Sequence, residues 1–168
     1  MKHKTTHKHT SEALQSKTRG FQKKVRGNLP KKKKQPSKST LKLEAWRWFS
    51  KYIRLRDCML TTGSFEYGEC VSCDKTFPFA QLDAGHFIPK KSGNYFSERG
   101  VNAQCRSCNR YHNANQLEYR REIIRRYGVG VDEELEQEAR QIIKRPPEDL
   151  TNLAEQYKMK VEKLLRGG

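Results

Sequence analysis

Four of the five cysteines form two Cys-x-x-Cys pairs, Cys70-Val-Ser-Cys73 and Cys105-Arg-Ser-Cys108. A tight turn inside such a pair lets both thiolates reach one zinc ion, and two pairs complete a closed tetrahedral site of the structural kind. A disulfide would require an oxidising compartment, for which the sequence shows no signal, and a redox motif would use one pair rather than two. We therefore expect one structural Zn²⁺ ion, and we expect Cys58 to be a buried thiol.

The long spacer between the two pairs contains residues that could do acid–base or metal chemistry. Asp83-Ala-Gly-His86 is followed by a Gly/Ser/Asn loop and then by Asn102, and Asn109 comes directly after the last cysteine. A single histidine in a strand can simply be a half-buried structural residue. A strand with Asp and His, a loop, an Asn and a helix opened by Cys-x-x-Cys could nevertheless surround one small cleft.

The residues before the cysteines predict an amphipathic helix that begins at Ser39 or Thr40 as its N-cap. Large apolar residues recur there at spacings of three and four, with Lys and Arg between them. These residues are Leu41, Leu43, Ala45, Trp46, Trp48, Phe49, Tyr52, Ile53 and Leu55. We expect the aromatic side chains in the core, while the basic face either contacts DNA or is solvated.

Two runs typical of β-strands follow, Phe65–Val71 and Thr76–Ile88, rich in aromatic residues and interrupted by Gly and Pro. Residues Asn115–Tyr127 then predict a helix closed by Gly128. The residues that this helix is expected to bury are Leu117, Ile123, Ile124 and Tyr127.

The net charge of +16 is concentrated at the N-terminus. Residues 1–38 contain thirteen Lys or Arg, one acidic residue and few apolar residues, so we expect a disordered basic arm that binds polyanions without sequence preference or merely aids solubility. Residues 39–128 should form a zinc-stabilised domain, and residues 129–168 a helical extension. No apolar run approaches the roughly 20 residues that span a bilayer, and no apolar segment follows Met1 as in a secretory signal.

This ordered set of motifs resembles the HNH, or ββα-metal, nucleases, and more closely the NinG/Rap family of phage recombination proteins. The first resemblance rests on Cys70-Val-Ser-Cys73, Asp83-Ala-Gly-His86, Asn102 and Cys105-Arg-Ser-Cys108-Asn109. The second adds Tyr52-Ile-Arg-Leu-Arg-Asp57 and a later Asn115…Tyr119-Arg120…Tyr127-Gly128, so that it covers residues 40–128. It implies an α+β fold, with a zinc-stapled ββα-metal (HNH-like) core and flanking helices.

The resemblance implies a metal-dependent endonuclease that cleaves branched recombination intermediates, such as Holliday junctions and D-loops, in the cytoplasm of a bacterial or phage-infected cell. In such an enzyme the neutral imidazole of His86 would take a proton from the attacking water. Asp83 and Asn109 would hold Mg²⁺ or Mn²⁺, with His112 and Asn113 as further candidates. Asn102 would tie the loop to the strand and hold His86 in its working tautomer.

Two departures from the family pattern concern the metal ligands. Many HNH proteins have a histidine where this chain has Asn109, and many have adjacent Asp and His where this chain separates Asp83 from His86 by Ala-Gly. In a strand, Asp83 and His86 would point to opposite faces. Asp83 remains the expected metal ligand in this interpretation.

Basic residues near the expected cleft are candidates for phosphate contacts, which position a backbone without reading bases. These are Lys90, Lys91, Arg99, Arg106 and Arg110, and Arg120, Arg121, Arg125 and Arg126 line the following helix. Two other functions fit the same residues: a non-catalytic, zinc-stabilised DNA-binding recombination protein, and an RNA-binding zinc protein. Symmetric cleavage of a junction would call for a homodimer; we expect no membrane partner and no small-molecule cofactor.

Overall fold

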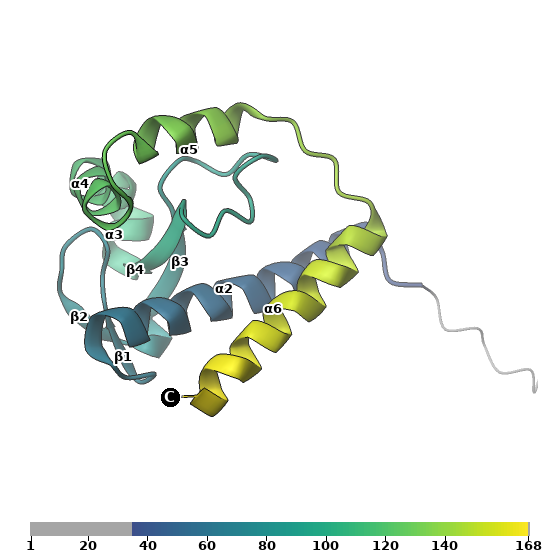
Figure 1. Ribbon diagram of the computed structural model, residues 1–168, viewed down its shortest axis with the longest axis horizontal. Helices are drawn as coiled ribbons and strands as arrows, with labels where there is room; N and C mark the ends of the chain where they lie inside the picture. The colour runs from purple at the N-terminus through teal and green to yellow at the C-terminus, as the bar shows by residue number, and fades with distance from the viewer. Residues whose placement is uncertain (1–34, 168) are drawn as a thin grey trace, which may run out of the picture. The chain divides into compact units, whose positions relative to one another are not determined.

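The predicted amphipathic helix is α2 (Lys38–Thr62), the first element of the computed structural model, which describes residues 35–167 (Figure 1). Its N-cap is Ser37 rather than Ser39 or Thr40, because the Ser37 hydroxyl accepts a hydrogen bond from the Thr40 N–H at 3.2 Å. The predicted basic arm lies, up to residue 34, outside the described residues.

Four short strands form two antiparallel hairpins. β1 (Tyr67–Glu69) pairs with β2 (Thr76–Pro78), and β3 (Leu82–His86) pairs with β4 (Val101–Cys105). The 3-10 turn η1 (Phe79–Gln81) separates β2 from β3, so the predicted run Thr76–Ile88 is two strands of different sheets. The sequence did not predict β4, because Val-Asn-Ala-Gln-Cys contains a single β-branched residue and no aromatic residue.

Beyond β4 lie the short helix α3 (Arg106–Tyr111), the 3-10 turn η2 (Asn113–Asn115) and α4 (Gln116–Tyr127). The Gly128 N–H bonds the Ile124 carbonyl at 2.8 Å and closes α4 where the sequence predicts.

The buried face of α4 differs from the prediction in two residues. Leu117 is 73% exposed and Tyr127 is also exposed, whereas Tyr119 and Ile123 are fully buried. The Tyr119 hydroxyl donates a hydrogen bond to the Gly85 carbonyl at 2.8 Å, which turns this face of the helix toward β3. Apolar spacing in the sequence shows that one side of a helix is buried, but it does not determine which residues lie at the centre of that side. In α4 the hydrogen bond of Tyr119 determines them.

The β3–β4 hairpin lies between two groups of helices (Figure 1). On one side, Val101 packs with Phe49 and Ile53 of α2. On the other side, Phe87 packs with Tyr119 of α4 and with α5 (Val131–Arg140). The hairpin therefore has a helix against each face, and its strand β3 bears both Asp83 and His86.

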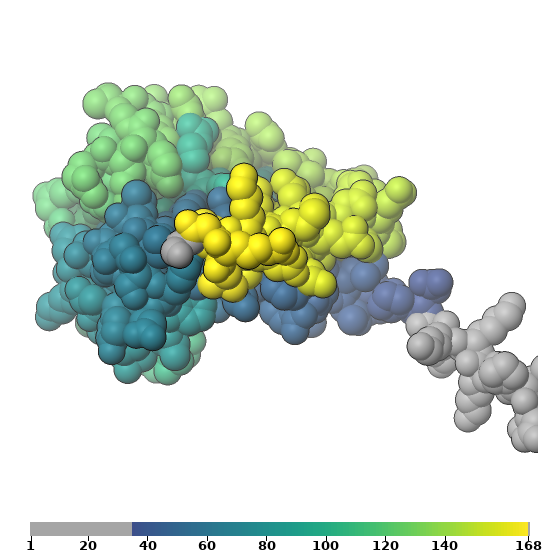
Figure 2. Space-filling view, turned by 60° about the horizontal axis from the view of Figure 1, so that its bottom comes forward, coloured from purple at the N-terminus to yellow at the C-terminus, as the bar shows by residue number. Residues whose placement is uncertain are grey.

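The last helix, α6 (Pro147–Gly167), packs along α2 and runs in the same direction (Figure 1). The rings of Phe49 and Tyr157 meet edge to face at 4.9 Å, and α6 forms part of the outer surface beside α2 (Figure 2). The C-terminal helices therefore belong to the same compact unit, Pro36–Gly168, as the cysteine pairs. Within the described part of the chain, no helix combines the length and apolarity needed to cross a bilayer.

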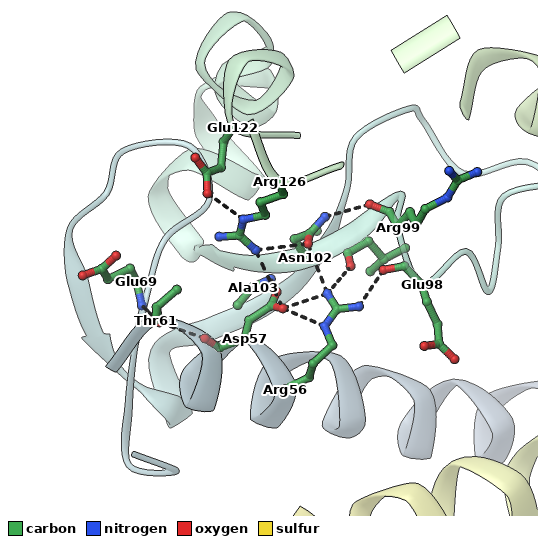
Figure 3. A network of polar contacts seen from close by, with 12 residues as sticks. Arg56, Asp57, Thr61, Glu69, Glu98, Arg99, Asn102, Ala103, Glu122 and Arg126 are labelled. Carbon is green, nitrogen blue, oxygen red and sulfur yellow. Dashed lines mark hydrogen bonds and ion pairs between the residues drawn. The ribbon is translucent and has the colours of Figure 1, made fainter. Parts of the chain in front are cut away.

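A buried carboxylate joins α2 to the hairpin (Figure 3). Asp57 is 1% exposed, and it accepts hydrogen bonds from the Ala103 N–H at 2.6 Å and from the Arg56 guanidinium at 2.8 Å. Arg56 also donates to the carbonyls of Glu98 at 2.6 Å and Val101 at 3.2 Å. The Arg-Asp pair in the run Tyr52–Asp57 therefore has a structural role.

The same network reaches α4 (Figure 3). Arg126 is a largely buried side chain that bonds Glu122 at 2.6 Å and the Asn102 side-chain oxygen at 3.3 Å, and lies 3.8 Å from Asp57. The Asn102 oxygen also accepts from Arg56 at 3.1 Å. One connected set of polar groups thus fixes α2, β4 and α4 relative to one another.

Replacing Asp57 by Ala should lower the free energy of unfolding by about 3–5 kcal/mol, because it leaves Arg56 without its carboxylate and the buried Ala103 N–H without its acceptor. Urea unfolding of the zinc-loaded chain measures this. Glu162→Ala is the control: its pair with Arg166 is exposed, so its loss should cost less than about 1 kcal/mol. Equal costs for the two variants would refute a central role for Asp57.

Candidate functional site

The four cysteines of the two pairs come together in one cluster. Their sulfur atoms all lie within 4.8 Å of one another. Zinc–sulfur bonds of about 2.3 Å in a tetrahedron put the sulfurs about 3.8 Å apart, so a small contraction would complete the site. Three of the four side chains are buried. The donor set and the spacing therefore fit a structural zinc ion held by Cys70, Cys73, Cys105 and Cys108.

The first pair is shaped by a tight turn between β1 and β2. The Cys70 carbonyl accepts from the backbone N–H of Cys73 at 3.3 Å and of Asp74 at 3.0 Å, and the Cys70 N–H bonds the Lys75 carbonyl at 3.0 Å. Asp74 adopts a left-handed conformation, with φ of 54°. This turn points both sulfurs of the pair in the same direction.

The second pair lies where β4 becomes α3. Cys105 ends the strand and is the N-cap of α3, and its sulfur accepts a hydrogen bond from the Cys108 N–H at 3.4 Å. The Val71 N–H bonds the Ala103 carbonyl at 2.9 Å and joins the first turn to β4. The metal cluster is thus built on the same hairpin that positions His86.

Burial raises the pKa of the Cys70 thiol to about 11 and also raises that of Cys108. At Cys105 burial acts in the same direction, but hydrogen bonds from Cys108 and the neighbouring thiols outweigh it and lower the pKa. Metal-free chains therefore keep the Cys70 and Cys108 thiols protonated at neutral pH. Zinc binding must displace those protons, which makes the affinity for zinc rise with pH.

His86, the last residue of β3, lines a cavity of about 500 Å³. The other residues lining it come from β3, the loop after it and the segment around η2: Ala84, Pro89, Lys90, Asn109, Asn113, Ala114 and Gln116. The structure therefore brings the predicted base, the predicted ligand Asn109, the further candidate Asn113 and the predicted DNA contact Lys90 to one cavity. His112 is exposed and does not line it.

The His86 imidazole is held by two neighbours, Tyr95 and Trp46. Its Nε2 lies 3.3 Å from the Tyr95 carbonyl, which can only accept, so Nε2 carries the proton and Nδ1 the free lone pair. Trp46 stacks on the ring with centroids 5.3 Å apart. Nδ1 is buried and has no partner among the described residues. Burial, with a smaller effect from Lys90, lowers the pKa of His86 to about 4, so the imidazole is neutral at physiological pH.

Asp83 lies on the opposite face of β3 from His86, as the alternation of a strand requires. Its carboxylate accepts from Asn109 at 3.1 Å and from Arg110 at 2.8 and 2.9 Å. Burial raises the pKa of Asp83, but these hydrogen bonds outweigh burial and lower the pKa below its usual value. Asn109 therefore joins the predicted ligand Asp83 to the His86 cavity, and Arg110 occupies both carboxylate oxygens.

The predicted role of Asn102 needs correction in one of its two parts: its side chain ties the loop to the strand, but it does not orient His86. Asn102 pairs with Gly85 in the hairpin, so its side chain lies on the face opposite to His86. Its amide donates to the Arg99 carbonyl at 3.0 Å, and its oxygen accepts from Arg56 and Arg126. Asn102 stabilises the buried network and makes no hydrogen bond to His86, whose orientation is set by Tyr95.

The predicted DNA contacts fall into two groups. Lys90 lines the cavity and Lys91 is exposed nearby on the same loop. The arginines already have partners: Arg99 pairs with Glu134 at 2.8 Å, Arg106 bonds the Ala80 carbonyl at 2.7 Å and Arg110 holds Asp83. The arginines of α4 also pair with acidic residues, namely Arg120, Arg121, Arg125 and Arg126. Their charges are largely compensated within the molecule.

Three consecutive non-glycine residues with positive φ follow α3, and the first two of them line the cavity. Asn113, Ala114 and Asn115 have φ of 48°, 62° and 47°. Each such residue is strained, and the strain persists only where neighbours enforce it. Here the Ala114 carbonyl accepts from Ser72 at 2.9 Å and from Gln104 at 2.6 Å. The cysteine turn and β4 thus hold this segment in place.

Sequence reasoning missed two residues that shape the site. Trp46 was expected only in the core, and Tyr95 had no predicted role. Trp46 contacts His86 from a distant part of the chain and Tyr95 contacts it through a backbone carbonyl within the loop, and no local spacing signals either contact. Gly85, by contrast, is explained by the close approach of strand β4: a side chain there would collide with Gln104.

One zinc ion per chain should be found by metal analysis, and Cys105→Ser should lose it. Serine keeps the N-cap of α3 but not the thiolate ligand, so this variant isolates the metal contribution. Cys58→Ala removes a buried cysteine outside the cluster and should retain zinc. Cooperative thermal unfolding that survives in strong chelator would contradict a structural role for the metal.

The pH dependence of stability should report the burial of His86. An unfolded chain binds a proton on this histidine as the pH falls through about 6.5, whereas the folded chain binds it only near pH 4. The free energy of unfolding should therefore fall with decreasing pH in this interval, by at most about 1.4 kcal/mol per pH unit for the one proton. His86→Gln should lose this slope, and His112→Gln, an exposed control, should keep it.

Known proteins that are similar to this chain in sequence belong to one family of bacteriophage proteins. The family model described as NinG, Bacteriophage Lambda NinG protein, matches residues 1–166. Protein ninG of Escherichia phage lambda is 38% identical over 69 residues, which cover 40% of this chain and 33% of that protein. Protein ninG of Salmonella phage P22 is 36% identical over 69 residues, covering 40% and 34%.

The protein ninG of Escherichia phage 933W is 38% identical over 69 residues and is matched over 34% of its length. The match thus spans about a third of the length of these curated relatives. No solved structure is significantly similar to the chain. Because the family model covers residues 1–166, the chain belongs to the NinG family of bacteriophage proteins.

Proposed function

We propose that this protein is a metal-dependent DNA endonuclease of the HNH-like kind that hydrolyses phosphodiester bonds in branched recombination intermediates. The observation that supports this most is the state of His86. A buried, neutral imidazole with one nitrogen oriented by a carbonyl and the other without a partner lines a cavity beside a lysine. An unsatisfied buried nitrogen is costly in a purely structural residue.

The imidazole would act as the general base. With the proton on Nε2 fixed by the Tyr95 carbonyl, Nδ1 is the atom that takes the proton from the attacking water. The low pKa of His86 keeps it neutral and ready to accept. A phosphate in the cavity would raise this pKa, because a nearby negative charge stabilises the imidazolium. The base would therefore strengthen when substrate binds.

A divalent cation would be held by Asp83 and Asn109, whose side chains already touch at 3.1 Å. Oxygen donors of this kind suit Mg²⁺ or Mn²⁺, and the bound ion would stabilise the charge that develops on the phosphate. Arg110 occupies both oxygens of Asp83 and is half exposed. Arg110 would have to move from Asp83 toward the DNA phosphate when the cation binds.

The paired Arg110 also favours a second candidate function, a zinc-stabilised DNA-binding recombination protein without catalysis. If the Asp83–Arg110 pair stays closed, no carboxylate in the cavity region remains for a cation. The two functions predict different results for the wild-type chain: cleavage of branched DNA with Mg²⁺ or Mn²⁺ supports the first, and binding without cleavage supports the second.

His86→Ala should slow Mg²⁺- or Mn²⁺-dependent cleavage of a four-way junction by about 10²- to 10⁴-fold, because it removes the general base. Zinc content and affinity for the junction should stay unchanged. Single-turnover cleavage of labelled junction and linear duplex measures the rate. His112→Ala, which removes an exposed histidine outside the cavity, should cut at nearly the wild-type rate. Wild-type cutting by His86→Ala would show that His86 is not the base.

A further inference from the structure

A second cavity, of about 230 Å³, lies at the other end of the loop that follows β3. It is formed by the first turns of α2, by residues of that loop and by the linker between α5 and α6. Apart from Tyr95, every ionisable side chain that lines it is basic: Lys38, Lys42, Lys144 and Arg145. We refer to these four residues and Tyr95 as the basic groove.

The cations of the basic groove are not compensated as the arginines of α4 are. Among residues 35–167, none of its four cations has a carboxylate oxygen within the 4.0 Å that defines an ion pair. Burial lowers the pKa of Arg145 even though Asp149 and Glu138 act against it. An anion bound in the groove would therefore be stabilised by positive charges that no carboxylate of residues 35–167 pairs with.

The groove is also preorganised. Arg145 donates to the Ser92 carbonyl at 2.9 Å and lies over the Phe96 ring at 5.3 Å. The ammonium of Lys42 lies 3.8 Å from the centroid of the Tyr95 ring. Two of the four cations are thus held in place before any ligand arrives, which reduces the entropy lost on binding.

Tyr95 connects the basic groove to the His86 cavity. Its ring lines the groove, its carbonyl orients His86 at 3.3 Å, and the two ring centroids are 6.2 Å apart. Lys90 in the cavity lies 5.3 Å from the Trp46 ring, which itself meets Tyr95 edge-on at 5.3 Å. Cationic and aromatic groups therefore follow one another without interruption from the cavity to Lys42.

We propose that the basic groove binds the sugar–phosphate backbone of the DNA strand whose scissile phosphate lies at His86, a few nucleotides from that phosphate. This inference rests on the proposed function for the identity of the strand. Lysine and arginine contacts of this kind neutralise phosphates without reading bases. The groove would thus fix the direction in which the strand leaves the cavity.

The test uses the zinc-loaded full chain and a fluorescent four-way junction without added Mg²⁺ or Mn²⁺, so that binding is measured apart from cleavage. Lys42→Gln/Lys144→Gln should weaken binding by about an order of magnitude near physiological salt. It should lower the slope of log affinity against log salt by about 1.8, or about 0.9 for each phosphate contact. The control, Lys75→Gln/Lys163→Gln, removes two exposed lysines outside the groove and should leave the slope unchanged.

Protection of lysines from acetylation gives a second, direct measurement on the unsubstituted chain. Bound junction DNA should protect Lys38, Lys42 and Lys144 more than Lys75 and Lys163. A wild-type salt slope in the groove variant, equal protection of both sets, or an effect on structured RNA but not on DNA would overturn the proposal. If the variant loses DNA affinity but the wild type never cleaves, the groove stands and the nuclease assignment falls.

Discussion

The arrangement of the molecule depends on one buried carboxylate, Asp57 of α2. A charge with 1% exposure is tolerated only where hydrogen bonds and cations surround it. The Ala103 N–H, Arg56 and Arg126 supply these from β4, α2 and α4. The carboxylate therefore requires all three elements to be in place together. Since β4 ends in Cys105 and pairs with the strand that bears His86, the metal cluster and the cavity both take their positions from this contact.

The two faces of strand β3 bear different ionisable side chains, His86 on one and Asp83 on the other. His86 points toward Trp46 of α2, while Asp83 points toward α3, where Asn109 and Arg110 hold it. Asn109 reaches both sides, since it bonds Asp83 and lines the cavity. In the proposed nuclease, a base and an anionic ligand would in this way lie near one phosphate without bonding each other. Separation of this kind keeps His86 free of a carboxylate that would hold it protonated.

Spacing in the sequence predicted the features that depend on near neighbours: the meeting of the cysteine pairs, the presence of the helices that became α2 and α4, and the opposite facing of Asp83 and His86. Spacing did not predict the features that depend on strand register or on contacts between residues far apart in the sequence. Strand β4 contains a single β-branched residue, and its position is determined by pairing with β3 and by the hydrogen bond from Ala103 to Asp57. The face of Asn102 follows from its pairing with Gly85, and the burial of Tyr119 rather than Leu117 follows from a hydrogen bond between α4 and β3. Local patterns contain none of this information.

Cys105 ends strand β4, is one of the four clustered cysteines that fit a zinc ion, and is the N-cap of α3. These three roles link metal capture to the order of folding. Each Cys-x-x-Cys turn is local and can take up zinc early, leaving half of the coordination shell open. When the second turn joins the first, it closes the loop that contains β3 and the residues around His86, and the entropy lost in that closure is offset by the metal bonds. Zinc availability in the cell would then affect how readily newly made chains acquire their cavity.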